Sequence, residues 1–359
     1  MEFCPYTPEA SSILLGISGG LDSSASLIRL KNNKAKLTAA MLLLQAEPFP
    51  IPDSSHLRMA EELCRKLGVP FEAIDAGEAF KQHVRTYFEE SYSAGLTPCP
   101  CALCNQHVKV PLLLEAAKSK EIPFVATGHY ASLYTDSEGK TFIGRGADTS
   151  KDQSYFLSRL PSDQIKHLYF PLQDEKKQSV RKDASNQNLP VSDMEESNDI
   201  CFAAGRVYTD LLRTAVPSAF REGNFIDEKG TVLGKHRGIA LYTVGQRKRI
   251  GLPGGPWFVK AIHEITNEII LVKGERPLTT TFSIAQLTLN IKEGTLFMNE
   301  NSIEVQTHYR SQSIPARFEK KGDSLRVYCE NPILAAPGQI CALYSGKVVL
   351  GSGIIEKEG

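Results

Sequence analysis

A short run rich in glycine and serine near the N-terminus has the composition of an anion-binding loop. The run SGGLDS at residues 18–23 follows the apolar residues 13–17 and precedes a helix-like segment. Two glycines let the backbone approach an anion closely, and a helix N-terminus points unpaired N–H groups at it. Ser18 and Ser23 add hydroxyl donors, and Asp22 can hold a magnesium ion that bridges phosphates. No lysine follows the glycines, so the loop is not of the Walker type; an ordinary Gly-Ser turn is the alternative.

Three cysteines crowd into a second segment, and a fourth lies far along the chain. Cys99, Cys101 and Cys104 sit just before a predicted helix, near whose N-terminus thiolates are favoured. Such spacing points to metal or redox chemistry rather than to structural disulfides. The alternatives are a disulfide pair, half of a zinc site, an iron–sulfur site, or a nucleophile with its helpers. The chain has no second C-x-x-C pair to complete a four-cysteine zinc site, so Cys201 is the remaining candidate partner.

The charge of the chain is balanced overall but unevenly distributed. The 359 residues carry 41 Lys and Arg against 41 Asp and Glu, which argues against a protein wholly devoted to nucleic acid. Residues 229–263, however, contain no acidic residue, and this predicts one surface for a phosphate-bearing partner. A solvated loop region with scattered lysines is the alternative. The basic residues of this stretch are Lys229, Lys235, Arg237, Arg247, Lys248, Arg249 and Lys260.

No targeting or membrane signal is visible in the sequence. No apolar run approaches the roughly 20 residues that a membrane span needs. The N-terminus also lacks a basic region followed by an apolar stretch. We therefore expect a cytoplasmic protein that does not associate with membranes.

The positions of these residues depend on the elements around them, and the first half of the chain alternates strands with helices. This alternation predicts a doubly wound parallel α/β sheet, in which ligands bind beyond the carboxyl ends of the strands. The loop at 18–23 and a turn at 127–130 both fall there. Strands are predicted at 13–17, 37–44, 71–74 and 124–127, and helices at 23–30, 54–67, 77–92 and 105–120.

The second half of the chain has a different texture. Glycine becomes frequent from about Gly205, which indicates a small central domain, and short alternating segments after Gly274 indicate an antiparallel β-barrel. The expected domains are residues 1–204, 205–274 and 275–359. Strands of the barrel are predicted at 283–291, 303–309, 316–318, 324–329, 340–344 and 348–355.

Eight short motifs in order resemble those of a known family. The loop is similar to the SGGxDS loop of the PP-loop ATP pyrophosphatases, which split ATP between the α and β phosphates and adenylate a substrate. With the other motifs, the chain resembles the bacterial tRNA-specific 2-thiouridylases nearly from end to end. The resemblance implies an enzyme that puts sulfur at C2 of the wobble uridine. The matching residues are 16–23, 97–105, 127–131, 151–157, 196–202, 245–248, 309–310 and 337–339.

The resemblance also implies roles for individual residues. Cys104 corresponds to the nucleophile and Cys201 to the cysteine that carries a persulfide, while Leu42 takes the position of a residue against adenine. The other residues implied to bind ATP are Gly16, Ile17, Ser18, Gly19, Gly20, Leu21, Asp22, Ser23 and Gly128. Those implied to contact tRNA are Cys99, Pro100 and Cys101, which face the target base, together with His129, Lys151, Asp152, Gln153, His308, Tyr309 and Gln339.

One departure from the family pattern concerns cofactors. Many relatives have an acidic residue three positions before the nucleophile, where this chain has Cys101. Cysteine is a poor general base and a good iron ligand. Similarity to sulfur transferases with C-x-x-C at this site predicts a 4Fe–4S cluster on Cys101, Cys104 and Cys201, in addition to ATP and Mg²⁺. One iron would then be open to bind sulfide.

The resemblance implies partners as well, and two other functions remain open. The expected partners are the tRNAs for Lys, Glu and Gln and a sulfur donor, either a protein or sulfide, and we expect a monomer. Residues 229–263 would hold phosphates of the anticodon stem while the base leaves its stack. The alternatives are a PP-loop enzyme that transfers nitrogen to an adenylated carbonyl, and an RNA-binding module without catalysis.

Overall fold

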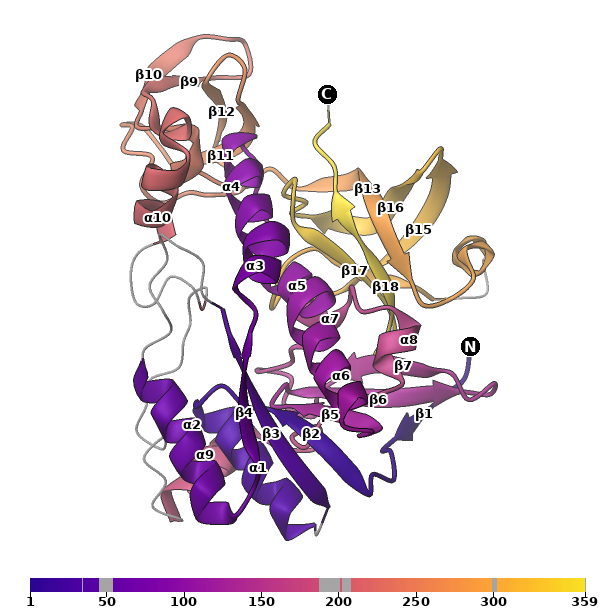
Figure 1. The fold of residues 1–359 in the computed structure, drawn as a ribbon. Helices are drawn as coiled ribbons and strands as arrows, with labels where there is room; N and C mark the ends of the chain where they lie inside the picture. The colour runs from indigo at the N-terminus through magenta and orange to yellow at the C-terminus, as the bar shows by residue number, and fades with distance from the viewer. Residues whose placement is uncertain (34, 45–53, 187–200, 202–207, 299–301, 359) are drawn as a thin grey trace.

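Three β-sheets and the helices around them make up the protein (Figure 1). The computed structural model describes residues 1–33, 35–44, 54–186, 201, 208–298 and 302–358. In this part of the chain a parallel sheet lies at one end, a small four-stranded sheet at the other, and a large antiparallel sheet to the side.

The parallel sheet is the predicted doubly wound sheet. Its spatial order is β4-β3-β2-β5-β8, and every neighbouring pair is parallel. The order reverses between β2 and β5, because β3 and β4 lie on one side of β2 while β5 and β8 lie on the other. Loops that leave the sheet at such a switch point diverge and leave room for a ligand. The strands are β2 (Ser12–Gly16), β3 (Lys36–Leu43), β4 (Phe71–Asp75), β5 (Phe124–Thr127) and β8 (Leu168–Tyr169).

Helices α1 (Leu21–Asn32) and α2 (Ser54–Leu67) cover one face of this sheet. Ala60 and Cys64 of α2 are fully buried, and Gly68 follows the helix at φ +62°. A left-handed glycine is a common C-terminal helix cap. Helix α9 (Lys177–Asn186) packs beside α1 in the same layer.

Two long helices contain a wider π-helical turn that the sequence did not predict. The first comprises α3 (Gly77–Phe80), η1 (Lys81–Arg85) and α4 (Thr86–Ser93), and the second comprises α5 (Pro100–Cys104), η2 (Asn105–Lys109) and α6 (Val110–Ser119). The second helix begins at Pro100 rather than at the predicted residue 105. Proline is well suited to a first helical position, since its missing N–H is not needed there. Cys101 and Cys104 therefore lie within the helix, and Cys99 is its N-cap.

The C-terminal strands form the predicted barrel. Six strands pair in the order β18-β13-β16-β15-β14-β17, and β17 pairs back with β18, which closes the ring. Closure removes the exposed edges that would otherwise pair with other chains. Leu325, Val327 and Leu343 fill the interior. The strands are β13 (Thr279–Leu289), β14 (Glu304–Gln306), β15 (Ile314–Lys321), β16 (Ser324–Ile333), β17 (Ile340–Ser345) and β18 (Val348–Ile355).

The barrel sheet also contains strands from the N-terminal part of the chain, which the sequence analysis missed. They are β1 (Phe3–Tyr6), β6 (Ala131–Asp136) and β7 (Thr141–Arg145), and Val348 of β18 pairs with Gly144 of β7. Gly144 has no room for a side chain, because a Cβ there would lie 2.4 Å from Tyr134 Cδ2. The hairpin of β6 and β7 thus ties the barrel to the parallel sheet through β5.

The central segment shares its core with the first long helix. Phe80 and Phe88 of that helix are buried in one cluster with Leu212, Phe225 and Ile269. Figure 1 shows the first long helix, from α3 to α4, rising from the end of β4 to the small sheet. The small sheet has the order β10-β9-β12-β11. Its strands are β9 (Gly223–Ile226), β10 (Val232–His236), β11 (Trp257–His263) and β12 (Glu268–Lys273), and helix α10 (Tyr208–Ala215) precedes them.

Two statements about the whole chain complete the fold. The predicted domain boundary at residues 204–205 lies outside the described residues, and both predicted boundaries stay predictions. Among the described helices, none combines the length and the apolar composition that crossing a membrane requires.

Replacement Phe88→Ala tests the shared core. The Phe88 ring contacts Tyr92 at a centroid distance of 5.0 Å and Tyr208 at 6.3 Å, so its loss leaves a cavity between the helix and the central segment. We expect the free energy of unfolding in urea to fall by about 3–5 kcal/mol. The control Ile265→Ala, at a side chain that is 93% exposed, should change it by less than about 0.5 kcal/mol. Equal effects of the two replacements would contradict the shared core.

Candidate functional site

The predicted ATP loop connects β2 to α1 at the switch point of the parallel sheet. The backbone N–H of Ser18 donates to Ser23 Oγ at 3.1 Å, and Ser23 Oγ donates to the Gly20 carbonyl at 3.1 Å. Gly19 has φ +72°, and a Cβ there would lie 2.3 Å from the His56 carbonyl oxygen. No side chain caps the N-terminus of α1 at Gly20. The loop is therefore held open by its own hydrogen bonds and leaves the helix N-terminus for an anion.

The turn after β5 lies against this loop. A Cβ at Gly128 would lie 3.0 Å from both Asp22 C and Ser23 N, so only glycine lets the turn come so close. Tyr130 is buried, and its hydroxyl donates to Asp22 Oδ1 at 3.0 Å. The structure thus brings together Gly128 and the loop at residues 16–23, which the sequence had predicted as parts of one site.

Asp22 is already paired with a cation from α9. Lys177 Nζ lies 2.5 Å from Asp22 Oδ1 and 2.7 Å from Oδ2. The expected role of Asp22 was to hold Mg²⁺, but an ion would have to compete with this ammonium. The described residues also form no group of three metal-ligating side chains. Mg²⁺ bound with a nucleotide needs only one or two carboxylates besides the phosphates, so the role of Asp22 toward that ion stays a prediction, and we derive no step through it.

The cysteine segment opens the second long helix. Cys99 is its N-cap residue and is buried, Cys101 is half-buried, and Cys104 is buried. The expectation that a helix N-terminus favours thiolates is wrong here, because burial acts more strongly. Burial raises the pKa of Cys99 and Cys104 to about 12 and that of Cys101 to about 11. These residues rest as thiols at neutral pH.

Lys109 is the cation that acts on Cys101 and Cys104. It is the fifth residue after Cys104, and the π-helical turn between them places i and i+5 on one face. Lys109 lowers the pKa of Cys104 against the effect of burial. Burial would lower the pKa of Lys109, but Cys104, Cys201 and Cys101 together raise it. Lys109 therefore remains a cation and can stabilise a thiolate.

His129 connects the thiols to the nucleotide loop. Its ring Nδ1 lies 2.8 Å from Thr127 Oγ1. Burial, together with the charge of Lys109, lowers the pKa of His129 to about 3, so the imidazole is neutral. Gly128 and Tyr130, on either side of it in the chain, contact the start of α1. The turn thus contacts the loop through Gly128 and Tyr130, and through His129 it lies near Lys109 of the cysteine helix.

Cys201 is exposed and close to the other two candidate cysteines. In addition to burial, its presence raises the pKa of Cys101 and Cys104. The other residues of its motif, 196–200 and 202, lie outside the described residues. All cysteines in the described part of the chain are free, and none of them joins a group of three metal-ligating side chains. The arrangement therefore does not fit a cluster site as it stands, and no step is derived through a cluster.

The barrel holds the segment that leads into the cysteines. Gln339 Nε2 donates to the carbonyls of Thr97 at 3.0 Å and Pro98 at 3.3 Å. The Thr97 N–H donates to the Pro337 carbonyl at 2.8 Å. Gly338 has φ +90°, and a Cβ there would lie 2.9 Å from Leu96 Cβ. Gln339, expected to contact tRNA, is thus engaged in fixing the approach to Cys99.

The motif at residues 151–153 supports the turn after β5. Asp152 Oδ2 pairs with Arg145 at 2.9 Å, and its other oxygen accepts the Ser154 N–H at 3.0 Å. Gln153 Oε1 accepts the Tyr130 N–H at 3.0 Å. Both side chains have partners within the protein, and their role toward tRNA stays a prediction. Lys151 is half-buried beside them.

The remaining predicted residues lie around the same region. His308 is half-buried, and its Nδ1 is buried with no hydrogen-bond partner in the described part of the chain. Tyr309 packs on Phe156 at a ring distance of 4.5 Å. Leu42 is half-buried at the edge of two apolar clusters, as a residue beside a ligand can be.

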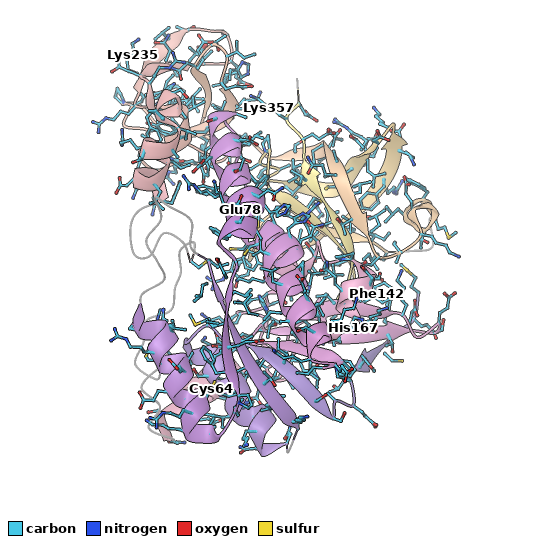
Figure 2. All side chains as sticks on the ribbon, in the orientation of Figure 1. Cys64, Glu78, Phe142, His167, Lys235 and Lys357 are labelled. Carbon is cyan, nitrogen blue, oxygen red and sulfur yellow. The ribbon has the colours of Figure 1, made fainter. Side chains whose placement is uncertain are left out.

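The basic stretch lies on the central segment. All its lysines and arginines are exposed, and Lys260 pairs with Glu228 just before the stretch. Arg247, Lys248 and Arg249 follow each other on one turn. Figure 2 shows Lys235 at the end of the molecule farthest from the parallel sheet. The basic surface is thus far from the nucleotide loop, and a partner that contacts both has to be extended.

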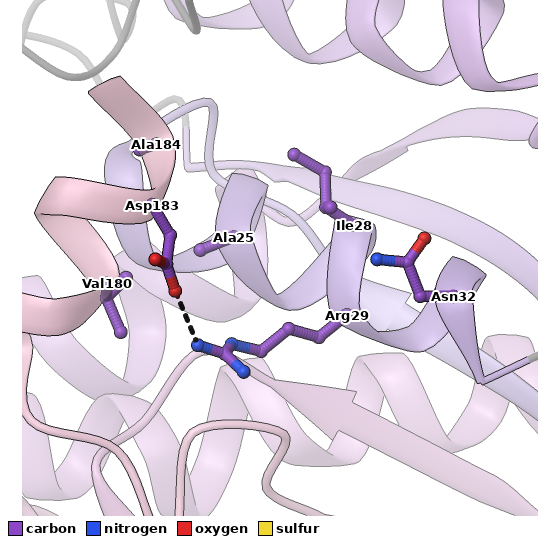
Figure 3. Close-up of a pocket in the computed structure, with 7 residues that line it drawn as sticks. All are labelled: Ala25, Ile28, Arg29, Asn32, Val180, Asp183 and Ala184. Atoms are coloured by element: carbon purple, nitrogen blue, oxygen red, sulfur yellow. Dashed lines mark hydrogen bonds and ion pairs between the residues drawn. The ribbon is translucent and has the colours of Figure 1, made fainter. Parts of the chain in front are cut away.

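Two lysines that contact the candidate site escaped the sequence analysis. Lys177 and Lys109 stand in polar helical segments without a recognisable pattern. Only the five-residue spacing of Lys109 from Cys104 was visible, and it is meaningless in an ordinary α-helix, where i and i+5 diverge. A small pocket, lined by Ala25 and Arg29 of α1 and Val180 of α9, lies beside the C-terminal half of α1 and away from the loop (Figure 3).

Comparison with known families matches three consecutive segments of the chain. Residues 11–205 match the family described as tRNA methyl transferase HUP domain. Residues 209–273 match the tRNA methyl transferase PRC-barrel domain, and residues 280–355 match the aminomethyltransferase beta-barrel domain.

Individual relatives are similar over nearly the whole chain. A protein of Dehalococcoides mccartyi named tRNA-specific 2-thiouridylase MnmA is 34% identical over 355 residues, 97% of each chain. Proteins of the same name are 35% identical in Chloroflexus aggregans, over 97% of this chain and 99% of the other, and 33% identical in Clostridium botulinum, over 96% and 97%. The resemblance predicted from the motifs is confirmed, and the chain belongs to the tRNA-specific 2-thiouridylase family.

Proposed function

We propose that this chain is an ATP-dependent tRNA 2-thiouridylase that replaces the C2 oxygen of the wobble uridine with sulfur. The observation that carries the proposal is the turn at residues 128–130. It contacts the nucleotide loop through Gly128 and Tyr130, and its His129 lies close enough to Lys109, on the cysteine helix, to feel that charge. Activation by ATP and attack by sulfur can therefore take place at one bound base.

The first step activates the base. The C2 oxygen of uridine is a poor leaving group, and its attack on the α-phosphorus of ATP releases pyrophosphate and makes it a good one. The open N-terminus of α1 and the hydroxyls of Ser18 and Ser23 suit the negative charge of the phosphates. Neutral His129 adds no charge beside the base.

The second step transfers sulfur and needs two cysteines. The terminal sulfur of a persulfide on Cys201 attacks C2, and AMP leaves with the oxygen. The Cys104 thiolate then attacks Cys201 Sγ, the S–S bond of the persulfide breaks, and its electron pair stays on the sulfur bound to C2. A Cys104–Cys201 disulfide remains, which a thiol reductant must reduce. Lys109 favours the thiolate that this step requires.

The proposed substrate is tRNA, of the kinds that carry Lys, Glu and Gln. The exposed basic surface of the central segment suits the phosphates of an anticodon stem. The target uridine has to leave its stack to reach buried Cys104, which costs a few kcal/mol. The sulfur donor can be a persulfide-carrying protein or sulfide.

Replacement of the two cysteines separates activation from sulfur transfer. Cys104→Ser and Cys201→Ser should each lower 2-thiouridine formation at least about 100-fold, since each removes a sulfur atom that the second step needs. Release of pyrophosphate from ATP with tRNA should continue. The readouts are mass spectrometry of tRNA nucleosides and a pyrophosphate assay, with exposed Cys4→Ser as the control. Unchanged 2-thiouridine in both variants would refute the two-cysteine step. Pyrophosphate release by the wild type without any 2-thiouridine would favour nitrogen transfer, and no pyrophosphate release would favour a binding module.

Cys101→Ser decides between the persulfide route and the predicted 4Fe–4S cluster. The persulfide route uses only Cys104 and Cys201, so we expect thiolation with a persulfide donor to stay within about threefold of the wild type. Anaerobically purified protein should contain no iron and no acid-labile sulfide. Iron bound by the wild type and lost with activity in Cys101→Ser would establish the cluster instead.

The salt dependence of tRNA binding tests the basic surface. Each lysine or arginine on a phosphate contributes about 1 to the slope of log affinity against log salt concentration. The double variant Arg247→Ala/Lys248→Ala should therefore bind more weakly with a slope smaller by about 2. Lys31→Ala/Lys66→Ala, which removes two exposed charges from α1 and α2, is the matched control. Identical slopes in both double variants would place tRNA elsewhere.

A further inference from the structure

The predicted nucleotide loop has no positively charged side chain. Residues 16–24 contain no lysine or arginine, although the leaving pyrophosphate gains negative charge as the bond to the α-phosphorus breaks. Enzymes that transfer phosphoryl or adenylyl groups commonly place a cation at this point. A cation for this loop therefore has to come from another part of the chain.

Lys177 lies at the place where such a cation is needed. It is separated by 155 residues from Asp22, yet its Nζ lies 2.5 and 2.7 Å from the two Asp22 oxygens in the first turn of α1. No further acceptor for its third N–H is found among the described residues. The ammonium thus stands beside the helix N-terminus with one donor to spare.

The surroundings hold the Lys177 side chain in one place. Only 11% of it is exposed, against 31% of the Asp22 side chain. Tyr130 stands on the other side, with the ammonium 5.5 Å from its ring centroid and its hydroxyl on Asp22. The backbone N–H of Lys177 donates to Asp148 Oδ2 at 2.9 Å, which fixes the start of α9. A lysine whose rotamer is already fixed before a ligand arrives loses less conformational entropy on binding.

We propose that Lys177 binds the β- and γ-phosphates of ATP and stabilises the departing pyrophosphate, and that Asp22 and Tyr130 are the residues that orient it. Lys177 thus supplies from α9 the charge that the loop lacks. Asp22 then acts as a positioning residue for the ammonium. The proposal rests on the proposed function and adds the group that recognises the triphosphate.

A purely structural role for the Asp22–Lys177 pair is the competing explanation, and the same two helices offer a control. Arg29 of α1 pairs with Glu175 at 2.8 Å and with Asp183 of α9 at 3.3 Å (Figure 3). This second contact joins α1 to the region of α9 but lies beyond the loop. Its removal should loosen the packing of the two helices without touching a phosphate.

The experiment compares ATP with AMP by isothermal titration calorimetry on the full chain. Lys177→Met should weaken ATP binding at least tenfold and leave AMP binding within about twofold, because AMP lacks the β- and γ-phosphates. Lys177→Arg, which keeps the charge, should recover part of the ATP affinity. Arg29→Met should leave the ratio of the two affinities unchanged. The rate of pyrophosphate release should fall with Lys177→Met even at saturating ATP.

Three results would overturn the inference. They are unchanged ATP affinity in Lys177→Met, an equal loss of ATP and AMP affinity, and an equal loss of selectivity in Arg29→Met. If Lys177→Met fails to fold, Lys177→Gln and Asp22→Asn replace it with the same expected loss of selectivity. Failure of the wild type to bind ATP would instead refute the proposed function, so the two outcomes are distinguishable.

Discussion

The parallel pairing of β2 with β5 is the constraint on which the rest of the site depends. Leu14 pairs with Val125 and Gly16 with Thr127, so both strands end at one level and their following residues meet. The turn at Gly128 can approach α1 only because it has no side chain. Once this contact exists, Tyr130 reaches Asp22 and His129 faces the cysteine helix. A shift of β5 by one residue would turn these side chains to the other face of the sheet.

The barrel contributes to the site from outside the nucleotide-binding part. Its loop at Pro337–Gln339 hydrogen bonds to residues 97 and 98, just before Cys99. The hairpin of β6 and β7 extends the barrel sheet and begins directly after the turn at 128–130. The cysteine segment is therefore clamped between elements that are far apart in the sequence, and this explains why a small barrel belongs to the catalytic unit.

Electrostatics divides the site into two halves with opposite needs. Near α1, Lys177 and the helix N-terminus favour anionic phosphates. Near Cys104, burial keeps the thiols protonated, while Lys109 opposes that effect. The two lysines lie on either side of the turn at 128–130, whose own histidine is neutral. Such a separation suits a reaction in which negatively charged pyrophosphate leaves on one side of the base and a sulfur nucleophile attacks from the other.

The sequence by itself determined the nucleotide loop, all strands of the parallel sheet except the two-residue β8, the barrel and the identity of the candidate cysteines, because local spacing and alternation encode them. It did not determine that Cys104 and Lys109 share one face of the cysteine helix, since a π-helical turn has no recognised sequence signal. Nor could it show that burial outweighs the helix N-terminus at Cys104, because burial depends on residues from the whole chain. The pairing of Asp22 with Lys177 was decided only by the tertiary structure, which packs α9 against α1 and thereby joins residues that no local pattern relates.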